Sequence, residues 1–294
     1  LIGVRDPHGY RPLCLGKTQA GYVLSSETCA LDAIKAEYIR DIEPGEMVII
    51  DDNGVRSRMY APADKIEKKV CVFEYIYFAR SDSRIDGQSV YETRLAMGRE
   101  LARETQYDAD IVMSIPDSGT TAALGYARES GIPFAEGLIK NRYSGRTFIK
   151  PSQEERELAV RMKLNPVPEV VKGKRIVLID DSIVRGTTSG IIVKMLKEAG
   201  AKEVYMCVSS PAIEYPCHYG IDTSVRKELI AATHTVEEVR QYINADKLHY
   251  LSQEGLDRAV AGLSGNEMCF ACFDGDYAVA VPEEQEEGVK YVLE

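Results

Sequence analysis

The sequence lacks the features that would mark a membrane or secreted protein. It contains no run of about 18 apolar residues, so we expect no membrane-spanning helix. Its opening residues, LIGVRDPHGY, do not have the pattern of a signal peptide. An excess of basic charge is also missing, because the formal net charge is -10, and general nucleic-acid binding relies on a basic surface. We therefore expect a cytoplasmic protein that binds neither membrane nor nucleic acid.

Cysteine is too scarce and too scattered for a disulfide framework in a cytoplasmic chain. The seven cysteines are Cys14, Cys29, Cys71, Cys207, Cys217, Cys269 and Cys272. The last two are spaced as Cys-x-x-Cys, a spacing shared by zinc sites, iron–sulfur sites, redox pairs and pairs of buried thiols. Spacing by itself leaves these four interpretations open.

With 294 residues and 45% hydrophobic content, the chain is long enough for two domains. Residues 1–66 have the alternation and turn signals of a β-rich region, including a hairpin that turns at Asp52-Asn53-Gly54. Within this region, residues 30–42 have the pattern of a short amphipathic helix. The polar segment 61–69, with an early proline, is the best candidate for a domain boundary.

The chain after that boundary alternates between strand and helix patterns. We expect strands at 71–80, 110–115, 134–139, 176–179 and 203–209, and helices at 90–104, 122–129, 235–244 and 252–263. Alternation of this kind predicts an α/β fold with a parallel sheet flanked by helices.

The most informative stretch is 175–190, RIVLIDDSIVRGTTSG, which has the pattern of a strand, a polar loop and the start of a helix. Asp180 and Asp181 stand at the carboxyl end of the strand, where open α/β sheets bind ligands. The loop from Ser182 to Ser189 offers backbone N–H groups and hydroxyls to a phosphate at a helix N-terminus, and its glycine allows close approach. The two acids can accept hydrogen bonds from a sugar diol or hold Mg²⁺.

The signatures of ATP and NAD sites, Gly-x-x-x-x-Gly-Lys-Ser/Thr and Gly-x-Gly-x-x-Gly, are absent. A sugar phosphate is therefore the favoured ligand. A second strand, polar loop and helix pattern includes Pro116 to Thr121. Between the two units, the segment from Lys140 to Lys163 holds seven Lys or Arg residues against three Glu. This segment is either a solvated loop that leads into a helix or a lid that brings cations onto phosphates.

These stretches resemble, in order, the motifs of one enzyme family. VLIDDSIVRGTTS, at 177–189, resembles the 5-phosphoribosyl-1-pyrophosphate (PRPP) signature of type I phosphoribosyltransferases, and more narrowly that of glutamine PRPP amidotransferases. Further matches are RDPHGYRPL at Arg5, CVFEYIYFARSDS at Cys71, IPDSGTTAALGYA at Ile115, KNRYSGRTFIKPSQ at Lys140, KLNPV at Lys163 and CFACFDGDY at Cys269. Because these ordered matches cover nearly the entire chain, it is identified as a member of this family.

The resemblance implies a type I phosphoribosyltransferase fold at 67–263, preceded at 1–66 by the late part of an N-terminal-nucleophile (Ntn) glutaminase domain. A cysteine-bearing segment, 264–294, would follow. The family carries out the first committed step of de novo purine synthesis, in which PRPP and glutamine or ammonia give 5-phosphoribosylamine and pyrophosphate. Its mature chains begin with a catalytic cysteine, whereas this chain begins with Leu1. We therefore expect a fragment that uses ammonia with PRPP and does not hydrolyse glutamine.

Site residues follow from the same resemblance. The PRPP-binding set would be Asp180, Asp181, Ser182, Val184, Arg185, Gly186, Thr187, Thr188, Ser189, Lys150 and Lys163. Ser118 would join the two acids at a Mg²⁺ ion near the pyrophosphate, and the segment 140–163 would close over PRPP. Ammonia would attack C1 as pyrophosphate leaves, with electrostatic stabilisation and without a side-chain nucleophile.

The cysteine contexts resemble those of the Bacillus-like branch of the family, which carries a structural 4Fe–4S cluster. Its ligands would be Cys71, Cys217, Cys269 and Cys272. We expect the other three cysteines to be buried, inert thiols, and we do not expect His218 to bind zinc. The resemblance also implies a homotetramer that purine nucleotides inhibit.

Three other interpretations compete with this one. A salvage or pyrimidine phosphoribosyltransferase would share the PRPP loop, but the cysteine set speaks against it. A non-catalytic, PRPP-sensing regulator would need a winged DNA-binding segment and a basic face, whereas residues 1–66 resemble a late glutaminase domain. A scaffold with a vestigial loop is the third, and measurements of PRPP binding and pyrophosphate release would test it.

Overall fold

A computed structural model of the chain describes residues 1–141, 153–221, 223, 225–261 and 267–281. The chain divides into two compact units, and each is described by itself. Unit 1 comprises residues 1–96 and 256–270, and unit 2 comprises residues 97–255 and 271–294. In the described part of the chain, no helix is both long enough and apolar enough to span a membrane. These units are defined by contacts in space, whereas the boundaries expected near residues 66 and 263 refer to the domains of the family. Those boundaries stay a prediction.

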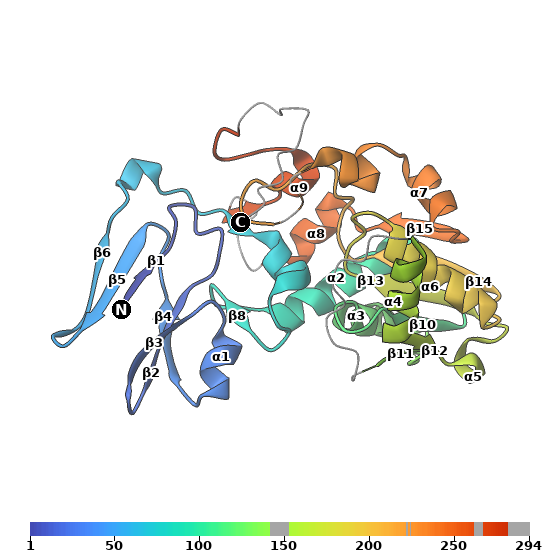
Figure 1. The fold of residues 1–294 in the computed structure, drawn as a ribbon, viewed down its shortest axis with the longest axis horizontal. Coiled ribbons are helices and arrows are strands. Elements are labelled where there is room, and N and C mark those ends of the chain that lie inside the picture. Colours follow the sequence, from blue (N-terminus) through green and yellow to red (C-terminus); the bar gives the residue numbers. More distant parts are fainter. Residues whose placement is uncertain (142–152, 222, 224, 262–266, 282–294) are drawn as a thin grey trace. The chain divides into compact units, whose positions relative to one another are not determined.

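Unit 1 begins with two small antiparallel sheets (Figure 1). The first has the order β1-β5-β6 and the second the order β3-β2-β4. The strands are β1 (Ile2–Val4), β2 (Cys14–Thr18), β3 (Gly21–Ser25), β4 (Glu37–Asp41), β5 (Glu46–Asp51) and β6 (Gly54–Met59). Asp51 pairs with Gly54, so the expected hairpin turn at Asp52-Asn53-Gly54 is confirmed.

The helix expected at 30–42 is only half correct. Helix α1 (Thr28–Ala33) ends early, Lys35 has a positive φ of 55°, and the chain then forms β4. Strand β4 pairs with β2 through Tyr38 and Gly16 among others. Pairing with a strand distant in sequence decides the conformation here, because tertiary contacts override a helical pattern in a segment with β-prone residues.

The strand expected at 71–80 is also wrong for most of its length. A short strand β7 (Val70–Cys71) pairs in parallel with β16 (Met268–Cys269), and residues 74–78 form a π-helix. The buried guanidinium of Arg94 donates to the carbonyls of Tyr75 and Ala79, over 2.7 and 2.8 Å. These two carbonyls therefore have hydrogen-bond partners without a neighbouring strand.

The remaining elements of unit 1 lead into its long helix. The 3₁₀ turn η1 (Ala63–Lys65) comes first, and the hairpin of β8 (Arg84–Ile85) and β9 (Gln88–Ser89) precedes α2 (Val90–Thr105). Asp86, in the hairpin turn, has a positive φ of 46°. Helix α2 begins at the expected Val90 and continues into unit 2. Helix α8 (Gln253–Ala259) lies within the expected helix at 252–263 but is shorter.

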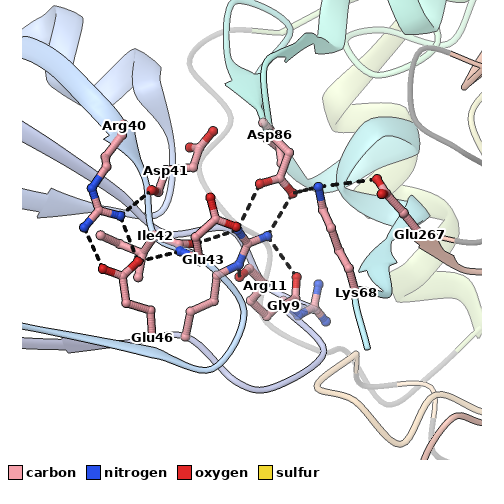
Figure 2. Close-up of polar contacts among 12 residues, drawn as sticks. Gly9, Arg11, Arg40, Asp41, Ile42, Glu43, Glu46, Lys68, Asp86 and Glu267 are labelled. Atoms are coloured by element: carbon pink, nitrogen blue, oxygen red, sulfur yellow. Dashed lines mark hydrogen bonds and ion pairs between the residues drawn. The ribbon is translucent and has the colours of Figure 1, made fainter. Parts of the chain in front are cut away.

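A polar network in unit 1 joins its distant segments (Figure 2). Arg5, 2% exposed, donates to both carboxylate oxygens of Asp86 over 2.9 Å. It also donates to the carbonyls of Gly9, Arg11 and Ile42 over 3.0, 3.2 and 2.8 Å. The guanidinium therefore has a partner for each of its donor nitrogens, which is how proteins stabilise a buried charge.

Unit 2 contains the parallel sheet that the strand and helix alternation predicts. Its order is β10-β13-β14-β15, and all three neighbouring pairs are parallel. The strands are β10 (Ile111–Ser114), β13 (Arg175–Asp180), β14 (Glu203–Val208) and β15 (Lys247–Tyr250). The expected strands at 110–115, 176–179 and 203–209 are thus confirmed, whereas β15 was not anticipated.

Helices cover the sheet of unit 2 (Figure 1). Leu178, Met206 and Val208 pack into one core with Ile192 and Leu196 of α6 (Thr187–Glu198). Val177 and Ile179, whose side chains alternate to the other face, are fully buried as well, and α3 (Thr120–Ser130) packs against β10 and β13. Burial on both faces explains the unbroken apolar run 176–179, since each such side chain contributes about 1.5–3 kcal/mol.

Smaller elements complete unit 2. Of the strand expected at 134–139, Phe134 forms a bridge with Val112, while β11 (Leu138–Lys140) pairs with β12 (Leu164–Pro166) in a separate antiparallel ribbon. The other elements are α4 (Gln153–Lys163), α5 (Pro168–Val171), η3 (Arg226–Glu228), η4 (Ile230–Ala232), α7 (Val236–Tyr242) and α9 (Ala271–Asp274). Helix α7 begins with a capping box formed by Thr235 and Glu238, which places its start as expected.

Candidate functional site

The candidate site is the loop that follows β13, at the carboxyl end of the central sheet. Asp180 is the last residue of β13, and Gly186 is the N-cap of α6. Gly186 has a φ of 72°, a left-handed conformation that favours glycine. The N–H of Gly190 bonds to the carbonyl of Gly186 over 2.9 Å, so the helix starts at once. The predicted residues Thr187, Thr188 and Ser189 lie in its first turn, where backbone N–H groups have no partner within the helix.

The two acids at this end of the sheet are buried. Asp180 is 8% exposed and Asp181 6% exposed. Asp180 accepts the backbone N–H of Asp181 over 3.0 Å, and Asp181 accepts the hydroxyl of Ser182 over 2.6 Å. Among the residues that the structure describes, neither carboxylate forms an ion pair. Burial, together with the neighbouring charge of Asp181, raises the pKa of Asp180 well above its usual range.

A second loop, between β10 and α3, packs against the first. The N–H of Ile115 donates to the carbonyl of Ile179 over 2.8 Å. A Cβ at Gly119 would lie 2.6 Å from that carbonyl oxygen and 3.3 Å from the Cα of Asp180, so only glycine allows this approach. Ser118, the predicted third Mg²⁺ ligand, precedes Gly119 and is half-buried. The structure therefore brings the second loop to the end of β13.

The basic segment is described only in part. Lys140 forms an ion pair with Asp117 of the second loop. Lys163, the last residue of α4, is half-buried, and its carbonyl accepts the N–H of Asn141 over 2.7 Å. Lys150, the other predicted PRPP-binding lysine, lies outside the described residues. The lid interpretation of this segment stays a prediction.

Two groups of residues beside the loop were missed by sequence reasoning. Ser209 and Ser210 are buried beyond the end of β14, and the N–H of Ser209 donates to the carbonyl of Asp180 over 2.9 Å. On the other side, Glu228 pairs with Arg185, and the N–H of Ile230 donates to the carbonyl of Val184 over 2.9 Å. The strand expected at 203–209 could have located the two serines, because residues at the carboxyl end of a parallel strand lie at the ligand-binding edge of the sheet. Nothing local in the sequence links Glu228 to Arg185.

The four cysteines predicted to bind iron fall into two pairs, one in each unit. In unit 1, Cys71 and Cys269 are partners in the parallel pairing of β7 and β16. In unit 2, the carbonyl of Cys272 accepts the N–H groups of Glu214 and Tyr215, both over 3.1 Å, close in sequence to Cys217. The Sγ of Cys217 accepts the N–H of Tyr219 over 3.4 Å. Within the described ranges, no three or more His, Cys, Asp or Glu side chains are grouped to hold a metal ion.

The other cysteines are buried thiols with low reactivity. Cys14 is 2% exposed, and burial raises its pKa to about 11. Burial also raises the pKa of Cys29 and of the fully buried Cys207. Because the thiolate is the reactive form, none of these three is an activated nucleophile. Cys71 is similarly buried, and its pKa rises to about 12. None of the seven cysteines, all of which lie in the described part of the chain, forms a disulfide.

Comparison with known proteins shows which proteins this chain is similar to. Residues 93–223 match the model of the phosphoribosyl transferase domain. An amidophosphoribosyltransferase of Archaeoglobus fulgidus is 55% identical over 286 residues, 97% of this chain. That of Bacillus subtilis is 52% identical over 284 residues, 96% of this chain. Over nearly its whole length, the chain is therefore similar to amidophosphoribosyltransferases. Both predicted loops lie within the matched domain, whereas Glu228 lies beyond it.

Two solved structures show the same fold over nearly the whole chain. The B. subtilis glutamine PRPP amidotransferase, complexed with ADP and GMP, superposes with a TM-score of 0.88 at 52% identity, covering 96% of this chain and 62% of that one. A structure described as the allosteric regulatory enzyme of purine biosynthesis gives the same score and identity. The chain spans 62% of the A. fulgidus relative and 59% of the B. subtilis relative. The predicted type I phosphoribosyltransferase fold is therefore confirmed, and an antiparallel region precedes it. That this region is the late part of a glutaminase domain stays a prediction.

Proposed function

We propose that this chain carries the PRPP-binding, glycosyl-transfer part of an amidophosphoribosyltransferase. The reaction forms 5-phosphoribosylamine and pyrophosphate from PRPP and ammonia, as the first committed step of purine synthesis. One observation carries the proposal: a buried, adjacent pair of carboxylates ends β13 directly before a loop that opens α6. Identities of 52–55% to named amidophosphoribosyltransferases support this reaction over a salvage transferase or a PRPP-sensing regulator.

The loop from Ser182 to Ser189 would hold the 5-phosphate of PRPP. The backbone N–H groups at the start of α6 point toward the loop, and the positive end of the helix dipole favours an anion there. The hydroxyls of Thr187 and Thr188 add donors, and both side chains keep some exposure to solvent. Asp180 and Asp181 would accept hydrogen bonds from the two ribose hydroxyls and so set the orientation of C1.

The acids also fit a Mg²⁺ ion. Two buried carboxylates without a cation among the described residues are electrostatically incomplete, and oxygen ligands are those that Mg²⁺ prefers. Asp180, Asp181 and the hydroxyl of Ser118 would be its protein ligands. When bound, Mg²⁺ supplies positive charge that stabilises the departing pyrophosphate. The side chains of Lys150 and Lys163 would add to that charge.

The nucleophile in this reaction is ammonia, so the protein needs no nucleophilic side chain. Its residues hold PRPP by both ends and keep C1 open to attack while negative charge grows on the leaving group. We further propose that the 294-residue chain uses free ammonia and does not hydrolyse glutamine. The buried state of Cys14 and Cys29 supports this, because neither thiol has the exposure or the lowered pKa of a catalytic cysteine.

A structural 4Fe–4S cluster bound by Cys71, Cys217, Cys269 and Cys272 is part of the same proposal. Four thiols are the number that such a cluster needs, and the N–H bond to the sulfur of Cys217 is of the kind that tunes cluster thiolates. Iron and sulfide analysis of anaerobically purified protein tests it. Absence of both, without broad visible absorption, would exclude the cluster.

Regulation, assembly and location complete the proposal. The B. subtilis relative was solved with ADP and GMP, and we propose that purine nucleotides inhibit this protein too. We also propose a cytoplasmic homotetramer. Sedimentation with and without GMP would report the assembly state and any change that the nucleotide causes.

The decisive experiment is a coupled assay of pyrophosphate release from PRPP with Mg²⁺ and ammonium. We expect activity with ammonium, none with glutamine, and loss of activity when EDTA removes the metal. Binding of Mg²⁺-PRPP without pyrophosphate release would favour the regulator interpretation. Failure to bind PRPP at all would refute the proposed function, and glutaminase activity would refute its ammonia-only part.

A further inference from the structure

The phosphate-binding loop has an outer wall, defined here as residues 226–232, that comes from far along the chain. Glu228 of this wall pairs with Arg185, 43 residues earlier. The N–H of Ile230 donates to the carbonyl of Val184 over 2.9 Å. The bond from Ile230 holds the main chain of the loop at Val184, and the ion pair with Glu228 holds the side chain of Arg185. Together they fix the peptide between Val184 and Arg185 from outside the loop.

The outer wall is itself firmly placed. Leu229 is completely buried, Ile230 is 8% exposed, and two 3₁₀ turns, η3 and η4, close it through bonds such as that from Leu229 N–H to the carbonyl of Arg226 over 3.0 Å. The wall also reaches the turn at Gly186, where an added Cβ would lie 3.0 Å from the Cδ1 of Ile230. The outer wall therefore lies against the loop at three consecutive residues, 184, 185 and 186.

Arg185 is the single charged residue in the loop from Ser182 to Ser189. Its guanidinium forms an ion pair with the carboxylate of Glu228. An arginine next to an anion site is normally expected to contact the anion. The guanidinium of Arg185 is paired with a carboxylate, and the loop also offers an anion its backbone N–H groups and hydroxyls.

We propose that Glu228 is a positioning residue for the 5-phosphate of PRPP. It acts through Arg185, holding the loop backbone in the shape that receives the phosphate. This inference rests on the proposed PRPP function of the loop. An exposed ion pair contributes little to global stability, but a loop that is already ordered loses less freedom when the ligand binds. Loss of Glu228 should therefore weaken binding of the 5-phosphate without unfolding the protein.

The test uses the full 294-residue chain and titration calorimetry with Mg²⁺-PRPP, ribose 5-phosphate and pyrophosphate. For Glu228→Gln we expect about three- to tenfold weaker binding of PRPP and ribose 5-phosphate. This is the cost of ordering one or two more groups of the loop when the ligand binds. Pyrophosphate binding should not change, since it lies at the other end of PRPP. Glu228→Asp should recover part of the loss. The matched control is Glu237→Gln, which removes the carboxylate of another exposed Arg pair in unit 2 and should bind all three ligands like the parent.

A double-mutant cycle separates positioning from general damage. We expect Arg185→Gln to lose as much affinity for ribose 5-phosphate as Glu228→Gln, and the double variant to lose no more than either. Parent-like binding of ribose 5-phosphate by Glu228→Gln would overturn the inference. So would fully additive losses, or an equal loss for pyrophosphate. If the parent itself binds neither PRPP nor ribose 5-phosphate, the proposed function fails instead.

Discussion

The two units bury acidic side chains in opposite ways. In unit 1, Asp86 is enclosed and receives two N–H groups of Arg5, and Lys68 lies 3.8 Å from it (Figure 2). In unit 2, Asp180 and Asp181 are also buried, yet within the described residues they receive one amide and one hydroxyl. The first cluster is electrostatically complete, and the second is not.

This difference separates a structural site from a site that needs a ligand. When a buried carboxylate is paired with a fully hydrogen-bonded cation, removal of either partner leaves an uncompensated charge and destabilises the fold. A buried pair of carboxylates without a cation costs free energy, and such costs are found where function requires them. The comparison predicts that substitutions in the first cluster change stability, and that those in the second change ligand binding.

The largest expected effect is that of Arg5→Ala on stability. The change leaves Asp86 buried without its main partner and removes the donors to three backbone carbonyls, so we expect a loss of about 3–5 kcal/mol in the free energy of unfolding. Urea denaturation measures it. Arg5→Lys keeps the charge without the bidentate geometry and should lose less, while Arg56→Ala, at an exposed pair, should change stability by under about 0.5 kcal/mol. Equal stability of Arg5→Ala and the parent would break the comparison.

Asp180→Asn should have the reverse effect. We expect at least about 100-fold weaker binding of Mg²⁺-PRPP, because the charged contact that we propose between Asp180 and the metal and ribose is lost. Without Mg²⁺ the variant should be no less stable than the parent, since the substitution removes a buried, uncompensated charge. Calorimetry and urea denaturation on the same protein measure both. Asp108→Asn is the control, because it removes an exposed carboxylate that pairs with Arg175 at the opposite end of β13. A strongly destabilised Asp180→Asn with normal binding would assign the acid pair to structure.

Local signals account for the parts of the fold and site that the sequence predicted correctly. The buried strand at 176–179, the acids after it and Gly186 before α6 stand together in sequence, so one short stretch encodes the strand, the turn and the helix start. The hairpin at Asp52-Asn53-Gly54 is of the same kind. In both cases, the residues that determine the conformation are neighbours in the chain.

Non-local contacts account for the failures. Residues 37–41 form a strand because they pair with β2. Residues 74–78 form a π-helix, and Arg94 of the next helix donates to the carbonyl of Tyr75 within it and to that of Ala79 directly after it. The outer wall at Glu228 and Ile230 is the clearest case, since Glu228 lies 43 residues from Arg185 in the sequence and pairs with it in the folded chain. Pattern analysis of short windows contains no information about such pairings.

Substitution of Glu46 should reduce stability by an intermediate amount, less than that of Arg5, and the reduction should depend on pH. Its carboxylate, 5% exposed, accepts two N–H groups of Arg40 over 2.6 and 2.8 Å, and these bonds lower its pKa below the usual 4.5. The folded protein therefore gains stability from ionised Glu46 above about pH 4.5 and loses it as the pH falls through the lowered pKa. We expect Glu46→Gln to cost about 1 kcal/mol at pH 7, because Arg40 is partly exposed.

The difference between Glu46→Gln and the parent should shrink on acidification below about pH 4.5, as the parent carboxylate takes up its proton. Urea denaturation at a series of pH values measures it. Glu37→Gln, at an exposed position in β4, should remain within about 0.5 kcal/mol of the parent throughout. A difference that grows on acidification would contradict the assignment of Glu46 to a completed ion pair.

The smallest effect should come from Lys68, which lies 3.8 Å from Asp86 and 3.5 Å from Glu267 and is partly exposed. Arg5 already satisfies Asp86, so Lys68 adds only a long-range, screened attraction, and we expect Lys68→Ala to cost at most about 1 kcal/mol. Because salt screens exposed pairs far more than buried ones, this cost should disappear in about 1 M salt while the Arg5→Ala cost persists. A salt-resistant Lys68 effect would mean that Asp86 depends on both cations, and the unit 1 cluster would then be less complete than its Arg5 bonds indicate.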